Sequence, residues 1–222
     1  MEQNANESVK SDRPATWRDD PRALEILTTE HWSLLSTRTL GYQEMFGRTT
    51  IFVAILSGTV VALALLAQAT EFRREALSFA MVLLAVVLFI GLATFVRSVA
   101  VNYEDARWVN GMNLLRHAYL EIVPELEPFF VTAHESDAEA RSLGYGSPQH
   151  LGNLARSLTT TSSVVAALNS VLAGALASGL GALFGLSTIV YASVGAGLSI
   201  VSGVIHVRYA ARFRQRHVPS PR

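Results

Sequence analysis

The feature that most constrains the fold is a charge-free stretch at residues 157–207. It contains no Asp, Glu, Lys or Arg, and His206 is its one readily titratable residue. As one straight helix it would be about 75 Å long, more than twice a hydrocarbon core of about 30 Å. The stretch must therefore fold back, and glycines within residues 181–185 permit a turn. We expect a hairpin at 157–207 with membrane spans at 161–180 and 186–207.

Two shorter apolar stretches precede it. Residues 51–70 carry no charge and are bounded by Arg48 and Glu71, and residues 76–96 are closed by Arg97. Both lengths match a bilayer span of about 20 residues. The sequence therefore predicts a first hairpin over 49–97. The predicted fold class is an all-α membrane protein with four transmembrane helices in two hairpins.

The remaining segments are polar or amphipathic. Residues 1–20 have no apolar core, so we expect a disordered tail and no signal peptide. Apolar residues at helical spacing predict an amphipathic helix over 21–48. The central segment, 98–156, should continue the second span as a helix to about 123, followed by a loop and a short helix from 150. Residues 208–222 form a basic tail.

Arginine placement predicts the orientation. Seventeen of the eighteen basic residues are Arg, and Lys10 is the other. In a four-span topology, only Arg73 and Arg74 fall near the membrane on one side. The juxtamembrane arginines on the other side are Arg38, Arg48, Arg97, Arg107, Arg156, Arg208, Arg212, Arg214 and Arg216. The positive-inside rule then places both termini and the central segment in the cytoplasm. The abundance of Arg, Ala, Gly and Val is associated with bacterial genomes, so the expected location is a bacterial inner membrane.

Composition narrows the functional classes. The chain has no Cys, which excludes disulfides and Cys-ligated metal sites. No predicted span holds an Asp, Glu, Lys or Arg, the residues that usually mark proton relays and ion-coupled transport. No motif of an intramembrane hydrolase is present. We therefore expect a protein that is not an enzyme and has no cofactor.

Small residues recur at intervals of four in three of the spans. One row is Ala54, Gly58 and Ala62; the others are Ser170, Gly174, Ser178 and Ala182, and Gly195, Ser199 and Gly203. Such rows allow helix backbones to approach closely in lipid. They predict either packing within the chain or a face for self-association, and the first row could serve either.

Uncharged polar residues also lie within the spans, most notably Asn169, Ser170 and Gln68. A buried amide in lipid usually forms hydrogen bonds between helices. The alternative is a polar ring that lines a pore formed by several subunits.

Two polar groups lie outside the spans. The tail carries Arg208, Arg212, Arg214 and Arg216, which should contact an anionic membrane surface; contact with the acidic central segment is the alternative. We expect no nucleic-acid binding from so short a run.

His117 and Glu121 are four residues apart, as metal ligands can be, but no third ligand is fixed by spacing. We therefore interpret them as a surface pair and predict no metal site.

One resemblance covers residues 22–210. The stretch at 102–119, NYEDARWVNGMNLLRHAY, with PELEP at 124–128 and EHWSLL at 30–35, resembles a family of uncharacterised bacterial integral membrane proteins. In layout, a cytoplasmic helix that leads into a membrane hairpin also resembles the two-span SLATT effector proteins. That resemblance implies oligomerisation into membrane-disrupting pores, although this chain has a second hairpin.

Together these observations predict a non-enzymatic inner-membrane protein that forms a homo-oligomer, with a pore or channel as one form. The alternative is a membrane scaffold or accessory subunit whose cytoplasmic helices bind another protein. The expected partners are the lipid bilayer, further copies of the chain and, in the alternative, a cytoplasmic protein.

Overall fold

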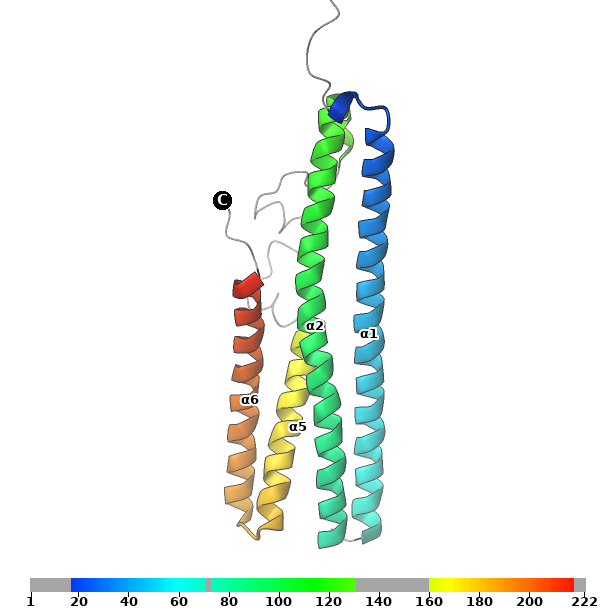
Figure 1. The fold of residues 1–222 in the computed structure, drawn as a ribbon. Helices are drawn as coiled ribbons and strands as arrows, with labels where there is room; N and C mark the ends of the chain where they lie inside the picture. Colours follow the sequence, from blue (N-terminus) through cyan, green and yellow to red (C-terminus); the bar gives the residue numbers. More distant parts are fainter. Residues whose placement is uncertain (1–16, 71–72, 131–159, 218–222) are drawn as a thin grey trace, which may run out of the picture. The chain divides into compact units, whose positions relative to one another are not determined.

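The computed structural model describes residues 17–70, 73–130 and 160–217, and within these ranges the chain is helical and contains no strand (Figure 1). This confirms the predicted all-α class. The predicted tail up to residue 16, the loop before residue 150 and the short helix after it lie outside the described residues. The four long helices are α1 (Ala23–Thr70), α2 (Arg74–Ile122), α5 (Thr161–Leu183) and α6 (Thr188–His217).

Each long helix contains a stretch long and apolar enough to cross a membrane, which confirms the prediction of a membrane protein with four candidate spans. α1 and α2 have 48 and 49 residues, whereas a span needs about 20. α1 is continuous through Gly41 and Gly47. The amphipathic segment 21–48 and the span 51–70 are therefore parts of one helix.

Helix ends follow local chemistry. α2 ends at Ile122, and a short 3-10 helix, Pro124–Phe129, follows it. Proline has no N–H to donate, and its ring disfavours helical backbone in the preceding residue. At the start of α5, the Thr160 side chain accepts a hydrogen bond from the Ser163 backbone N–H at 3.3 Å. The same N–H also donates to the Thr160 carbonyl at 3.0 Å, so the N-cap side chain adds a second acceptor in the first turn of the helix.

The turn between α5 and α6 lies at the glycines that the sequence singled out. Gly185 has φ +76°, a conformation that glycine adopts without strain. The Gly185 N–H donates to the Ala182 carbonyl, and the Leu186 N–H donates to the Gly181 carbonyl, each at 3.0 Å. These two bonds form the Schellman motif, which satisfies the last carbonyls of α5 and reverses the chain.

Contacts divide the chain into two compact units. Unit 1 comprises Met1–Thr37 with Trp108–Gly146, and unit 2 comprises Arg38–Arg107 with Ser147–Arg222. α1 and α2 contribute residues to both units, whereas α5 and α6 belong to unit 2 alone.

The core of unit 2 draws on α1, α2 and α5. Its buried apolar side chains are Phe52, Leu84, Val87, Phe95, Val99, Val165 and Leu172. From α6, Ala210 and Phe213 pack against this cluster. All four long helices therefore share one apolar core in this unit.

Unit 1 pairs the first part of α1 with the last part of α2. Leu34 packs against Gly111, and the rings of His31 and Tyr119 stack with their centroids 5.9 Å apart. The Tyr119 hydroxyl donates to the Leu27 carbonyl at 3.0 Å. The amphipathic segment predicted over 21–48 therefore packs against the helical continuation predicted to about residue 123.

Candidate functional site

The small-residue rows of α5 and α6 meet each other. A Cβ added at Gly174 would lie 2.6 Å from the Gly195 carbonyl oxygen and would overlap the Ser199 hydroxyl. The Ser178 hydroxyl donates to the Tyr191 carbonyl at 3.2 Å, and Gly203 faces Ser170. Because Gly174 has no side chain, its backbone lies against the Gly195 carbonyl and the Ser199 hydroxyl, the close approach that such rows permit in lipid.

The corresponding row on α1 is exposed among the described residues. Ala54, Gly58 and Ala62 are all exposed, and no atom lies within 4 Å of the position that a Gly58 Cβ would take. Gln68 is exposed on the same helix. This row is therefore available on the surface of unit 2.

Asn169 and Ser170 lie in the interior of unit 2. The Asn169 side chain is 0% exposed, and neither its amide nitrogen nor its amide oxygen has a hydrogen-bond partner in the described part of the chain. The Ser170 hydroxyl donates to the Ala166 carbonyl one turn back, at 2.7 Å. Burial of both residues argues against a pore lining within one copy, and among the described residues neither side chain forms the predicted hydrogen bond to another helix.

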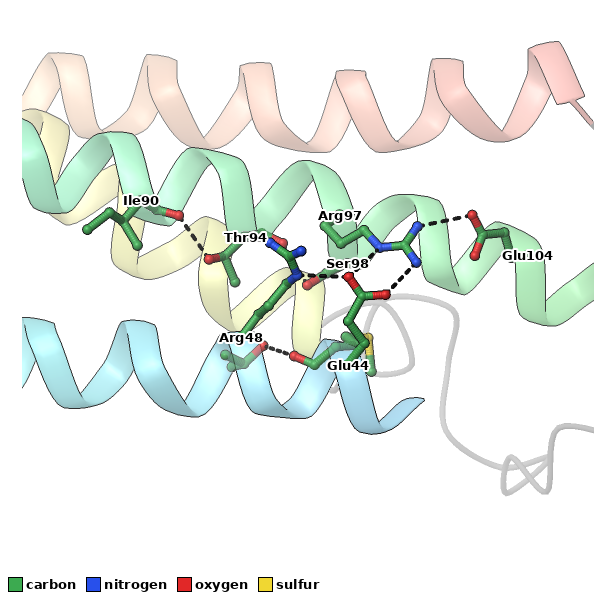
Figure 2. Close-up of polar contacts among 9 residues, drawn as sticks. Glu44, Arg48, Ile90, Thr94, Arg97, Ser98 and Glu104 are labelled. Carbon is green, nitrogen blue, oxygen red and sulfur yellow. Dashed lines mark hydrogen bonds and ion pairs between the residues drawn. The ribbon is translucent and has the colours of Figure 1, made fainter. Parts of the chain in front are cut away.

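A network of charged side chains joins α1 to α2 beside the predicted spans, and Figure 2 shows Glu44 on α1 facing Arg97 on α2. Glu44 accepts from Arg97 Nη2 at 2.7 Å and from Arg48 Nε at 2.9 Å. Arg97 Nη1 also donates to Glu104 at 3.1 Å. Hydrogen bonds from Arg97, and then from Arg48, hold the pKa of Glu44 below its usual value. We call Glu44, Arg48, Arg97 and Glu104 the arginine clamp.

A second ion pair lies further along the same two helices. Arg38 pairs with Asp105, which is 1% exposed. The Arg38 guanidinium also lies over the Tyr42 ring, 5.7 Å from its centroid. A buried carboxylate requires a cation beside it. This pair therefore fixes the two helices against each other where apolar packing alone would not exclude sliding.

Arg74 joins the start of α2 to the end of α5. Its Nη2 donates to the Leu183 carbonyl at 3.0 Å. The last carbonyls of a helix carry partial negative charge, so a guanidinium there is favourable. Arg74, one of the two arginines that the predicted topology separates from the others, thus has a structural partner.

The predicted membrane-surface arginines lie at the end of α6. Arg208 and Arg212 are exposed and four residues apart, so they share one helical face. Arg214 and Arg216 belong to the same helix, and their side chains lie outside the described set.

His117 and Glu121 form a surface pair, with His117 Nε2 3.5 Å from Glu121 Oε1. Glu121 also pairs with Arg18 at 2.8 Å. Within the described ranges, no group of three His, Cys, Asp or Glu side chains is placed to hold a metal ion.

The sequence analysis used Arg38 and Arg97 as markers of the membrane side and did not identify their acidic partners. The Arg97–Glu44 and Arg38–Asp105 pairs join residues 53 and 67 positions apart. A signal was present: Glu44 and Arg48 are four residues apart, and Arg97 and Glu104 are seven apart, so each set lies on one helical face.

A scan against protein-family models finds no match for this chain, and neither a search of curated proteins nor a search of solved structures finds one. The resemblances named above therefore stay predictions, and function must be argued from the geometry.

Proposed function

We propose that this chain is a non-enzymatic integral membrane protein that assembles from several copies of itself in a bacterial inner membrane, with both termini in the cytoplasm. The two hairpins and the cytoplasmic helical extensions are part of this proposal. The observation that carries it is the unoccupied small-residue row on α1.

The chain uses the same kind of row in two ways. On α5 and α6 the small residues are covered by each other, whereas on α1 Gly58 meets nothing within 4 Å. Lipid tails cannot fill a backbone groove as closely as another helix can, and small residues are the main device for helix association in bilayers. A second copy of α1 fits this groove.

The exposed face of α1 continues in a regular pattern. Ala54, Gly58, Val61, Leu65 and Gln68 are all exposed and follow spacings of four, three, four and three residues. This is the spacing of a helix–helix seam. Gln68 adds an amide to the face, and paired amides stabilise association of membrane helices.

The pore-like form of the assembly depends on Gln68. Because Asn169 and Ser170 are buried in unit 2, a conduit between copies would have to be lined by polar groups on α1. Among the three uncharged polar residues singled out in the spans, Gln68 is the one with an exposed side chain. The layout resemblance to SLATT effectors points in the same direction.

Native mass spectrometry of the protein in nanodiscs tests the assembly. We expect a defined oligomer, and we expect Gly58→Leu to shift it toward monomer. Gly197→Leu is the matched control. No atom lies within 4 Å of the position that a Gly197 Cβ would take, but the residue one turn later on α6 is the larger Val201, so Gly197 does not continue into a small-residue row. A monomeric wild-type protein, or equal effects of the two variants, would contradict the proposal.

A second candidate function rests on unit 1. Trp32 on α1 is 64% exposed, and Phe129 after α2 is 75% exposed. Contiguous exposed apolar patches mark protein-binding surfaces, and in this alternative Trp32 and Phe129 contribute to such a patch. If the protein is a scaffold, native mass spectrometry should show one copy of the chain bound to a stoichiometric amount of another protein. Trp32→Glu should then release that bound protein.

A further inference from the structure

Asn169 occupies a notch that exists because residue 91 is glycine. An added Cβ at Gly91 would overlap the Asn169 Oδ1 and would lie 2.8 Å from Phe52 Cε2. The amide oxygen thus sits against the α2 backbone, where Cα–H groups can contact oxygen. Three helices, α1, α2 and α5, meet at this point.

In a second notch the glycine lies on α5 and the side chain that fills the space comes from α2. The Met81 side chain on α2 fills the space beside Gly179 on α5, where an added Cβ would overlap its sulfur and its terminal methyl. Gly91 and Met81 are ten residues apart on α2, and Asn169 and Gly179 are ten residues apart on α5. Because the two helices run antiparallel, a single register satisfies both contacts.

Apolar packing alone does not select that register. A shift of α5 by one turn would place Asn169 opposite Val87 or Phe95, both of which are large and buried. The neighbouring apolar residues could re-form contacts after such a shift, whereas the amide would meet a buried side chain in place of a glycine. A single buried Asn at a helix seam is known to fix register at some expense of stability.

We propose that the Asn169–Gly91 and Met81–Gly179 contacts form a register key that sets where the α5–α6 pair docks on α2. The buried amide, which has no hydrogen-bond partner among the described residues, is retained for this specificity and not for stability. Asn169 acts as a positioning residue. The inference is independent of the assembly of several copies.

The absence of Cys from the chain permits a direct test of register. Asn102 Nδ2 donates to Ser162 Oγ at 3.2 Å, so Asn102→Cys with Ser162→Cys reports the native register. Asn102→Cys with Ala166→Cys reports a slip of one turn. Disulfide yields of the two pairs are compared in each background, in detergent.

In the unmodified background we expect the native pair to dominate at least tenfold. Asn169→Leu should lower this ratio severalfold while the midpoint of thermal unfolding stays constant or rises. Ser170→Ala, the neighbouring residue with a satisfied hydroxyl, is the control and should leave the ratio unchanged. A ratio unaffected by Asn169→Leu would overturn the proposal, as would a clear fall in thermal stability.

Gly91→Ala supplies the complementary test, because the new methyl group expels the amide. It should reduce the native crosslink or prevent folding. Because the new methyl group also lies 2.8 Å from Phe52 Cε2, Asn169→Ala in the same chain should restore only part of the loss. Gly179→Ala should have a milder effect, because the Met81 side chain is flexible. If Gly91→Ala leaves the native crosslink unchanged, the key does not exist.

Discussion

The two helix pairs of unit 2 are held together by different means. α5 and α6 meet through glycine and serine, with backbone against backbone at Gly174 and Gly195. α1 and α2 are joined by the arginine clamp and the Arg38–Asp105 pair, and by the large side chain of Phe52. The glycine and serine contacts of the first pair lie within the charge-free stretch 157–207, and the charged contacts of the second pair lie outside the predicted spans 51–70 and 76–96.

This difference shows what each device can do in a bilayer. Small residues act at any depth because they need no charge, but they specify only that some helix can approach. Ion pairs specify a partner, but they are tolerated only where water or headgroups are near. The row on α1 has small residues at intervals of four, as α5 and α6 do, but no described atom of another helix lies within 4 Å of the position that a Gly58 Cβ would take.

The largest effect should come from filling the α5–α6 contact. Gly174→Leu would force a side chain into the Gly195 carbonyl, which cannot move without displacing α6. We expect a loss of about 3 kcal/mol or more in the free energy of unfolding, at the upper end of overpacking effects. Reversible unfolding in mixed micelles measures it. Gly197→Leu is the control, and similar stability of the two variants would contradict the close packing.

The clamp between α1 and α2 should contribute less. Arg97→Gln removes donors from both Glu44 and Glu104, and we expect the Tm to fall by about 2–4 °C. Arg107→Gln, an exposed arginine on the same helix, serves as control. Equal Tm values for the two variants would show that the clamp is not formed in the membrane.

The same clamp sets a pH window. The pKa of Glu44 lies below its ordinary value of 4.5, chiefly through the hydrogen bond from Arg97. The stabilisation is therefore complete above pH 4.5 and is lost as the pH falls through the lower folded-state value. The Tm difference between wild type and Arg97→Gln should be constant from pH 8 to about pH 5 and shrink below that range.

The row on α1 should respond with the opposite sign to the row on α5. Gly58→Leu meets no neighbour within the chain. Replacing a helical glycine by leucine favours the helix by up to about 1 kcal/mol. Measured on the monomer in detergent, the stability of this variant should equal or exceed that of the wild type. A loss comparable to that of Gly174→Leu would mean that this face is covered within the chain.

The smallest effect concerns α1 and α2 in unit 1. Burial lowers the pKa of His31 below its ordinary value of 6.5, and the charge of Arg116 adds to this shift. A histidine with a lowered folded-state pKa favours the fold as long as it is neutral. Stability is therefore retained above pH 6.5 and falls as the pH drops below it.

Hydrogen exchange of the amides at residues 27–34 measures this response. We expect faster exchange at pH 5.5 than at pH 7.5, after correction for the intrinsic rate, and a smaller difference in His31→Gln. A pH response that survives His31→Gln unchanged would assign the effect to another group.

The sequence predicted the parts of this fold that depend on local rules. The turn at 181–185 follows from two glycines in an uncharged run too long for one span, and the end of α2 follows from Pro124.

The sequence did not predict that 21–48 and 51–70 form one helix, because glycines at 41 and 47 are compatible with a bend or with continuity. It also missed the partners of Arg38 and Arg97, because partners across two helices depend on register, and register depends on side-chain shape. The place of Asn169 depends on the absence of one methyl group at Gly91, which no periodicity reveals.

The contact between Arg74 and the Leu183 carbonyl has a consequence for the order of synthesis. In the orientation proposed here, Arg74 must be translocated while the first hairpin inserts, before the ribosome has made α5. During that interval the guanidinium can be solvated only by water and headgroups. In that orientation, completion of α5 then supplies a carbonyl acceptor for the Arg74 guanidinium.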